Sequence, residues 1–140
     1  MFEYVVREIS PEATRGMRQA ILRPHETIEE LAAHEPPGAF AVGAFDGDEL
    51  VAVGMIGPDG ASGAWRIRGM ATVAAVRGRG AGSAVLAALL EHAAAHGARR
   101  VWCNARTAAR SLYERAGLHV VSEEFEVSPV GPHYVMELLL

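Results

Sequence analysis

The sequence has only one cysteine, which excludes an intrachain disulfide and fits a reducing cytoplasm. It lacks any run of about 18 apolar residues and any basic stretch before an apolar one at its start, so we expect neither a membrane span nor a signal peptide. An excess of basic residues is also missing: the formal net charge is −4, which argues against a nucleic-acid-binding surface. Because the chain has 140 residues, half of them hydrophobic, we expect one cytoplasmic domain over residues 1–140.

A glycine-rich run, Arg77-Gly78-Arg79-Gly80-Ala81-Gly82-Ser83, lies between a predicted strand and a long alanine-rich helix. Glycines at alternate positions permit the dihedral angles of a tight turn and let a ligand approach the backbone closely. The first N–H groups of the following helix attract anions, and the two arginines add positive charge at the rim. The run therefore predicts a loop that binds a pyrophosphate.

Three phosphate-binding motifs can be compared with this loop. A Walker A loop is excluded because the run has no lysine, and a dinucleotide fingerprint would need a glycine at Ser83 and an acidic residue within 97–104. The pattern R-x-x-G-x-G fits Arg77, Gly80 and Gly82, and it resembles the acyl-CoA loop of the GNAT acetyltransferase superfamily. A glycine-rich loop that only begins a helix is the alternative.

The periodicity of apolar residues predicts the order of the elements. Ser10-Pro11 and Thr27 to Glu30 are typical helix starts, and Asp46-Gly47-Asp48 is a hairpin turn signal. Strands are predicted over residues 2–9, 40–45, 50–56, 65–72, 99–104, 118–127 and 133–139, and helices over 11–22, 27–34, 83–95 and 107–116. The strand–helix–strand unit in the middle implies a parallel crossover.

The order β-α-α-β-β-β-α-β-α-β-β resembles the GNAT arrangement over essentially the whole chain. Segments that look like a subgroup of small bacterial GNAT proteins are Leu22–Pro24, Gly69–Val73, Ser111–Leu118, Glu124–Glu126 and Gly131–Met136. The resemblance implies an α/β (α+β) fold, with a mixed, mostly antiparallel central sheet of about seven strands flanked by four helices.

The same resemblance implies acetyl-CoA as the cosubstrate, with no metal. The backbone at Met70 to Thr72 would hold the pantetheine arm in a slot between splayed strands, and an N–H near Met70 would stabilise the oxyanion. The expected cofactor-binding residues are Met70, Ala71, Thr72, Arg77, Gly78, Arg79, Gly80, Ala81, Gly82, Ser83 and Asn104.

Tyr113 is the candidate general acid, because its phenol carries a proton at neutral pH and the resemblance places it near the leaving sulfur. A ring packed in the core is the alternative. Many GNAT proteins have an asparagine seven residues before this tyrosine. Here Arg106 stands at that position, either as a phosphate contact or as a solvated side chain, and Asn104 lies two residues earlier.

The general base stays open at this point. The fourth predicted strand carries Arg66 and Arg68 and lacks the glutamate that many relatives have there. His133, Glu124 and Glu126 are the candidates, because a free alkyl amine is mostly protonated near pH 7 and must lose a proton before it attacks. A turn residue capped by its neighbours is the alternative for His133, which follows Gly131-Pro132.

Other reactive side chains carry weaker predictions. Cys103 is expected to be a buried, inert thiol in a strand. His92 and His96 share a helix face, as in zinc-binding helices, but no third ligand is evident, so we expect solvated surface histidines.

We therefore predict an acetyltransferase that acts on a primary amine of a small molecule or a peptide. A catalytically silent module that binds acyl-CoA is one alternative, and an oxidoreductase or nucleotide-binding domain is another. Arg15, Arg18 and Arg23 would favour an acceptor with a carboxylate, unless they are simply solvated. A homodimer is common for this fold, although nothing in the sequence fixes one.

Overall fold

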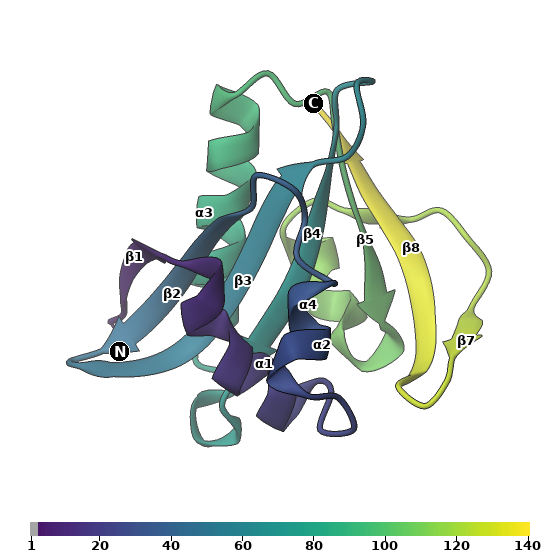
Figure 1. The fold of residues 1–140 in the computed structure, drawn as a ribbon. Helices are drawn as coiled ribbons and strands as arrows, with labels where there is room; N and C mark the ends of the chain where they lie inside the picture. Colours follow the sequence, from purple (N-terminus) through teal and green to yellow (C-terminus); the bar gives the residue numbers. More distant parts are fainter. Residues whose placement is uncertain (1–2) are drawn as a thin grey trace.

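The computed structural model describes residues 3–140 as one sheet with helices on both faces (Figure 1). The strands are β1 (Val5–Ile9), β2 (Phe40–Asp46), β3 (Glu49–Pro58), β4 (Ala64–Thr72), β5 (Arg100–Arg106), β6 (His119–Val120), β7 (Phe125–Val127) and β8 (Gly131–Leu139). The helices are α1 (Arg15–Ile21), α2 (Ile28–Ala32), α3 (Ala81–Ala95) and α4 (Arg110–Arg115), with 3₁₀ turns at Pro11–Thr14, Ala74–Val76 and Thr107–Ala109. The predicted strand start at Phe2 lies outside the described residues.

The strands follow the order β1-β2-β3-β4-β5-β8-β6, and β7 also pairs with β8. Every pair is antiparallel except β4 with β5. The predicted mixed, mostly antiparallel sheet and its parallel crossover are thus confirmed. The parallel pair is short: residues 64–66 match residues 100–102, and beyond them the two strands diverge.

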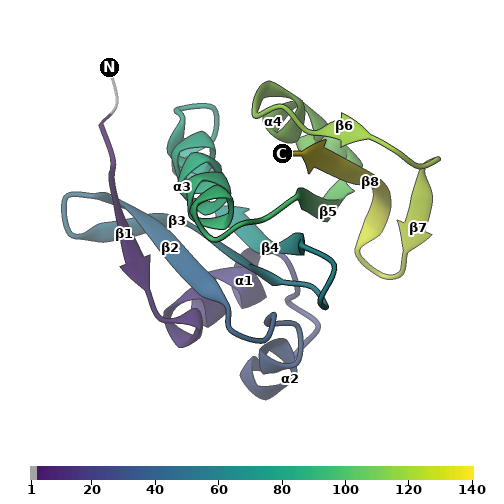
Figure 2. The ribbon, with the colours of Figure 1, turned by 90° about the horizontal axis from the view of Figure 1, so that it is seen from above.

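The helices form a layer on each face of the sheet. Figure 2 shows α3 and α4 on one face and α1 and α2 on the other. Val85, Leu86 and Leu89 of α3 are fully buried in the core that this helix forms with β2 and β3. Burying one such side chain contributes roughly 1.5–3 kcal/mol, so α3 is firmly anchored. The glycine loop before α3 is therefore held in a fixed place beside the end of β4.

Both predicted helix starts are confirmed. Ser10 Oγ accepts the N–H of Ala13 at 3.2 Å, and Pro11 follows as the first helical residue. Thr27 and Glu30 form a reciprocal capping box, with each hydrogen bond 3.1 Å long. No helix within residues 3–140 has both the length and the apolar character that crossing a membrane requires.

Some predicted elements are divided in the structure. The expected strand over 118–127 is two short strands, β6 and β7, that both pair with β8. Between them, Ser122 Oγ accepts the N–H of Val135 at 2.9 Å, so a side chain replaces a strand backbone as the acceptor. The first helix begins as a 3₁₀ turn, where Thr14 Oγ1 donates to the carbonyl of Pro11 at 2.6 Å.

Candidate active site

A cavity of about 1000 Å³ opens where β4 and β5 diverge. Its walls come from β4, β5, the end of α1, α4 and the glycine loop. Helices α1 and α4 cover opposite faces of the sheet (Figure 2). Residues at the end of α1 and in α4 both line the cavity, so the cavity passes between the two strands. The splay that the family resemblance implied is therefore present.

The glycine loop forms one end of this cavity. Gly78 and Gly80 have φ angles of +77° and +91°, and no atom lies within 4 Å of a Cβ built at either position. Glycine is needed there for the backbone conformation and not for space. No side chain caps the start of α3, so the first N–H groups of this helix are available to an anion.

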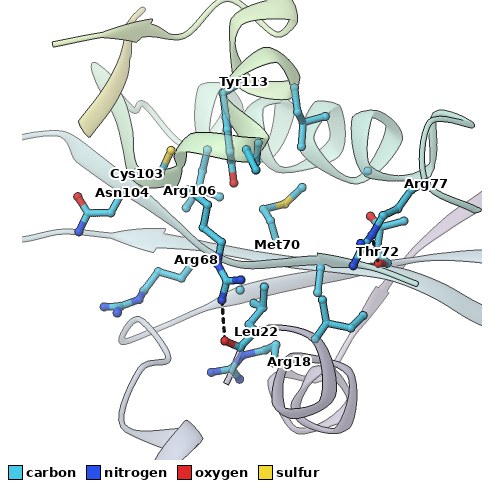
Figure 3. A pocket seen from close by; sticks show the side chains of 18 of the residues that line it. Arg18, Leu22, Arg68, Met70, Thr72, Arg77, Cys103, Asn104, Arg106 and Tyr113 are labelled. Atoms are coloured by element: carbon cyan, nitrogen blue, oxygen red, sulfur yellow. Dashed lines mark hydrogen bonds between the residues drawn. The ribbon is translucent and has the colours of Figure 1, made fainter. Parts of the chain in front are cut away.

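The expected cofactor-binding residues gather on the cavity, with one exception. Its lining includes Met70, Ala71, Thr72, Arg77, Gly78, Gly80, Ala81, Gly82, Ser83 and Asn104. Arg79 is exposed and does not line it. Arg77 lies in the glycine loop, and its Nε donates to the carbonyl of Thr72, the last residue of β4, at 3.2 Å (Figure 3).

The middle of β4 contains a β-bulge. Its register against β3 shifts by one residue between Arg68 and Ala71, and Gly69 has a φ of +67°. A bulge leaves backbone groups outside the regular ladder. Gly69 and Met70 both line the cavity, so the bulge lies where the expected oxyanion donor is needed.

Tyr113 reaches into the cavity from α4, and its hydroxyl points toward Met70 and Arg106 (Figure 3). Its ring packs in the hydrophobic core, and the residue is only 5% exposed. Burial raises the pKa of the phenol well above its usual value, Cys103 raises it further and Arg106 lowers it. The hydroxyl therefore keeps its proton at neutral pH, as a general acid must.

Arg106 is not solvated, so that interpretation was wrong. It is half-buried at the end of β5, and its Nη2 donates to the carbonyl of Leu22 at 2.6 Å, just beyond α1 (Figure 3). Burial lowers the pKa of its guanidinium. This hydrogen bond joins the wall formed by β5 to the wall formed by the end of α1, next to Tyr113. Asn104 lines the same cavity from β5.

Of the three candidates for the general base, only His133 lines the cavity. His133 is 6% exposed, and its Nδ1 lies 2.7 Å from the carbonyl oxygen of Gly131. Since a carbonyl only accepts, Nδ1 carries the hydrogen and a neutral His133 has its lone pair at Nε2. Glu126 is exposed on β7, and Glu124 accepts a hydrogen bond from Thr107 Oγ1 at 2.8 Å.

The remaining reactive side chains lie on β5 and at the C-terminal end of α3. Cys103 is buried as expected, and burial raises the pKa of its thiol to about 12. The rings of His92 and His96 stack with their centroids 4.0 Å apart, and His92 also stacks on Phe40 at 3.7 Å. Residues 3–140 contain no group of three His, Cys, Asp or Glu side chains that could hold a metal.

The arginines of α1 and its C-terminal end are paired rather than solvated. Arg18 is 3% exposed and donates to Glu35 at 2.8 Å. Arg15 binds the same carboxylate with two hydrogen bonds of 2.7 and 2.9 Å, and these, with Arg18, hold the pKa of Glu35 below its usual value. Arg23 pairs with Glu26 at 2.6 Å.

Several lining residues had no role assigned from the sequence. They include Ile67, Val76, Ala108 and Ala109. Arg66 and Arg68 had been noted only because a glutamate is missing there. Their alternation with the buried Ile67 was the signal that they share one face of β4.

The comparisons with known proteins agree with this geometry. The sequence matches the model of the acetyltransferase (GNAT) family over residues 4–118. It is 34% identical over 138 residues to YitI, an uncharacterised N-acetyltransferase of Bacillus subtilis (strain 168), with 94% of this chain and 93% of that protein covered.

Solved structures of low sequence identity share the fold. An IAA acetyltransferase from Bacillus cereus ATCC 14579 is 16% identical, with a TM-score of 0.78 over 99% of this chain and 100% of that one. A Bacillus subtilis acetyltransferase in complex with CoA is 15% identical, with a TM-score of 0.73 over 99% of each chain. Because the family model matches residues 4–118 of its 140 residues, this chain belongs to the acetyltransferase (GNAT) family and is an N-acetyltransferase.

Proposed function

We propose that this enzyme transfers the acetyl group of acetyl-CoA directly to a primary amine of its acceptor, with Tyr113 as the general acid. One observation carries the proposal: a single cavity joins the uncapped end of α3, the diverging part of β4 and the Tyr113 hydroxyl. The CoA bound by the structurally similar Bacillus subtilis acetyltransferase supports acetyl-CoA as the donor.

The glycine loop is suited to the diphosphate of coenzyme A. The N–H groups of Ala81, Gly82 and Ser83 lie at the positive end of α3, and Arg77 adds a cation nearby. A Cβ at Gly82 would lie only 3.2 Å from Thr72 Oγ1, so glycine lets the start of α3 pack closely against the end of β4. Beyond the pairs with β5, the free edge of β4 would bind the amides of the pantetheine arm.

The chemistry needs one bond to form and one to break. The amine nitrogen bonds to the acetyl carbonyl carbon, and the carbon–sulfur bond breaks. Tyr113 gives its hydroxyl proton to the departing sulfur and recovers a proton from solvent. A general acid contributes about 10²–10⁴-fold, and an oxyanion donor at the Gly69–Met70 bulge about 10²–10³-fold.

We assign the general base to His133, whose Nε2 would accept the amine proton directly or through a water molecule. The residue lines the cavity, and the bond to Gly131 fixes its tautomer. Glu124 and Glu126, the other two candidates, lie outside the cavity lining and take no part in the proposed step.

The test is the release of free thiol from acetyl-CoA over a panel of primary amines, with the acetylated products identified by mass. The chain contains no lysine, so acetylation of its own ε-amino groups adds no background. Thermal unfolding with acetyl-CoA and with NAD reports binding independently of turnover. We expect stabilisation by acetyl-CoA alone and turnover of at least one amine.

Each other outcome points to one alternative. Stabilisation by acetyl-CoA without turnover of any amine would support the catalytically silent acyl-CoA-binding module. Stabilisation by NAD and not by acetyl-CoA would reject the proposal.

We also propose that residues 1–140 act as a single domain in the cytoplasm, on a small-molecule or peptide amine. One continuous sheet and one hydrophobic core support the single domain. Light scattering of the purified protein distinguishes a monomer from a homodimer.

A further inference from the structure

The lining of the cavity is cationic, although the whole chain has a formal net charge of −4. Among residues 3–140, the lining includes seven arginines and neither aspartate nor glutamate. The arginines are Arg18, Arg23, Arg66, Arg68, Arg77, Arg106 and Arg115. Such a lining attracts anions and repels cations.

Four of these arginines already have partners. Arg18 and Arg23 form ion pairs with the glutamates at 35 and 26. Arg77 and Arg106 donate to backbone carbonyls. These four are held in place by the protein itself, so they do not require a ligand.

Arg66 and Arg68, on one face of β4, are different. Within residues 3–140 neither forms an ion pair with a carboxylate. The Nε of Arg66 is buried without a hydrogen-bond partner, while its guanidinium lies 4.5 Å from the centroid of the Trp102 ring. Asp59 is near enough to interact electrostatically with both arginines, but it accepts the indole N–H of Trp102 at 2.9 Å.

Arg68 keeps its charge in this setting. Burial, followed by repulsion from Arg66 and other nearby arginines, lowers the pKa of its guanidinium to about 10. That value leaves the side chain protonated at neutral pH. A half-buried positive charge therefore remains without an ion pair.

Figure 3 shows where this charge lies. Arg68 and Asn104 point to one side of the cavity, whereas Arg77 and Thr72 lie on the other side, with Tyr113 between them. The side with Arg77 belongs to the donor, because the glycine loop is there. The side with Arg68 is left for the acceptor.

We infer that the acceptor is an amine that also carries an anionic oxygen group, a carboxylate or a phosphate, and that Arg68 and Arg66 bind this group. The inference rests on the proposed acetyl transfer to an amine. Removing guanidinium groups from water without a partner is costly, and an oxyanion supplies the charge-assisted hydrogen bonds that they lack. A plain alkylammonium would be repelled by this lining, whereas an acceptor with both charges is close to neutral.

The first experiment compares acceptors that differ only in their end group. They are 3-aminopropanoate, 2-aminoethylphosphonate, 3-aminopropanamide and ethane-1,2-diamine, each also tested with one and two further methylene groups. We expect kcat/KM for an anionic acceptor to exceed that of its amide and diamine by about tenfold or more. The anionic acceptor with the higher kcat/KM shows whether the natural acceptor carries a carboxylate or a phosphate. Equal or better use of the amide or the diamine overturns the inference.

The second experiment changes Arg68. Arg68→Gln removes the charge, Arg68→Lys keeps it without the planar fork, and Arg7→Gln is the matched control on exposed β1. We expect Arg68→Gln to raise KM for the anionic acceptor by about 10–100-fold, with Arg68→Lys intermediate and Arg7→Gln unchanged. KM for the amide should not rise, and the thermal shift with CoA should stay as in the wild type. An equal loss for amide and anion would overturn the inference, because a general structural defect does not discriminate between them.

A binding measurement separates this inference from the proposed reaction. The CoA complex is titrated calorimetrically with N-acetyl-3-aminopropanoate, its phosphonate counterpart and N-acetyl-3-aminopropanamide. Suppose that the wild type binds an anionic product, that Arg68→Gln abolishes this binding, and that no amine is turned over. This result would support the anion site and reject acetyl transfer. Turnover without a preference for anions would reject the anion site alone, and so would failure of the wild type to bind either anionic product.

Discussion

At the residue scale, the Tyr113 hydroxyl is the group whose removal tests the mechanism most directly. Tyr113→Phe keeps the ring that packs in the core and removes only the proton donor in the cavity. We expect kcat to fall by about 10²–10⁴-fold, with the affinity for acetyl-CoA nearly unchanged. Steady-state kinetics and thermal shifts with acetyl-CoA measure the two effects separately. A variant with the kcat of the wild type would remove Tyr113 from the mechanism.

The pH dependence offers a second check on Tyr113. Burial raises the pKa of the phenol, so its proton is retained above the ordinary value of about 10. We expect Tyr113 to add no loss of kcat below about pH 10, and any alkaline decline in that range to be the same in wild type and in Tyr113→Phe. A decline near neutral pH that disappears in the variant would show that the phenol ionises earlier.

Glu35 is the residue on which the buried charge of Arg18 depends. Glu35→Gln would leave Arg18, only 3% exposed, without its counter-ion. We expect the free energy of unfolding to drop by about 1.5–3 kcal/mol at pH 7, measured by urea denaturation. The control is Glu114→Gln, which removes an exposed helix pair with Arg110 and should cost less than about 0.5 kcal/mol.

The sign of the pH effect follows from the direction of the shift. Hydrogen bonds from Arg15, then Arg18, lower the pKa of Glu35 in the folded protein, so its stabilisation is present above the unfolded pKa of about 4.5. It is lost as the pH falls through the lower, folded pKa. The difference between wild type and Glu35→Gln should therefore shrink below about pH 4. A difference that stays constant down to pH 3 would contradict this account.

At the element scale, the glycine loop is set by backbone conformation. Gly80 has a φ of +91° with open space around its Cβ position, so Gly80→Ala strains the backbone without a clash. We expect a loss of stability of about 1–2 kcal/mol and weaker binding of acetyl-CoA. The control is Gly16→Ala in α1, where φ is not positive and no atom is near, and which should stabilise by up to about 1 kcal/mol. Chemical denaturation and calorimetry check both variants, and equal effects would refute the conformational role of Gly80.

The elements differ in how well the sequence predicts them, and the reason is the range of the interactions. The caps at Ser10 and Thr27 were predictable because each depends on residues three positions away. The division of the strand over 118–127 was not predictable, because it depends on a hydrogen bond that Val135, in the distant strand β8, donates to Ser122. Local periodicity contains no information about that pairing.

The site shows the same contrast. The glycine loop and Tyr113 are carried by short motifs, so their place on the cavity, whose loop end is the proposed donor site, was predictable from the sequence. The partners of Arg18 and Arg106 were not, because Glu35 and Leu22 meet them only once α1 and α2 lie on the sheet. For the same reason, solvation was the wrong expectation for these two arginines, and the missing glutamate on β4 gave no hint of the anion site that we propose.

At the scale of the whole molecule, charge is distributed unevenly. The chain is acidic overall, yet the lining of its cavity includes seven arginines and no carboxylate among the described residues. A cleft lined with one sign of charge raises the local concentration of ligands of the opposite sign. The acidic remainder of the surface repels anions elsewhere, so acetyl-CoA should be directed to the cavity.

This distribution makes binding of the donor dependent on salt. Raising KCl from about 0.02 to about 0.3 M shortens the Debye length several-fold and screens the attraction between the arginines of the cavity and an anionic donor. We expect kcat/KM for acetyl-CoA to fall by roughly 3–10-fold, with kcat at saturation little changed. The control donor is S-acetyl-N-acetylcysteamine, a neutral thioester without the diphosphate, for which kcat/KM should stay within about twofold. An equal fall for both donors would mean that salt acts on the acceptor or on the fold, and the arginines would then have no role in attracting the cosubstrate.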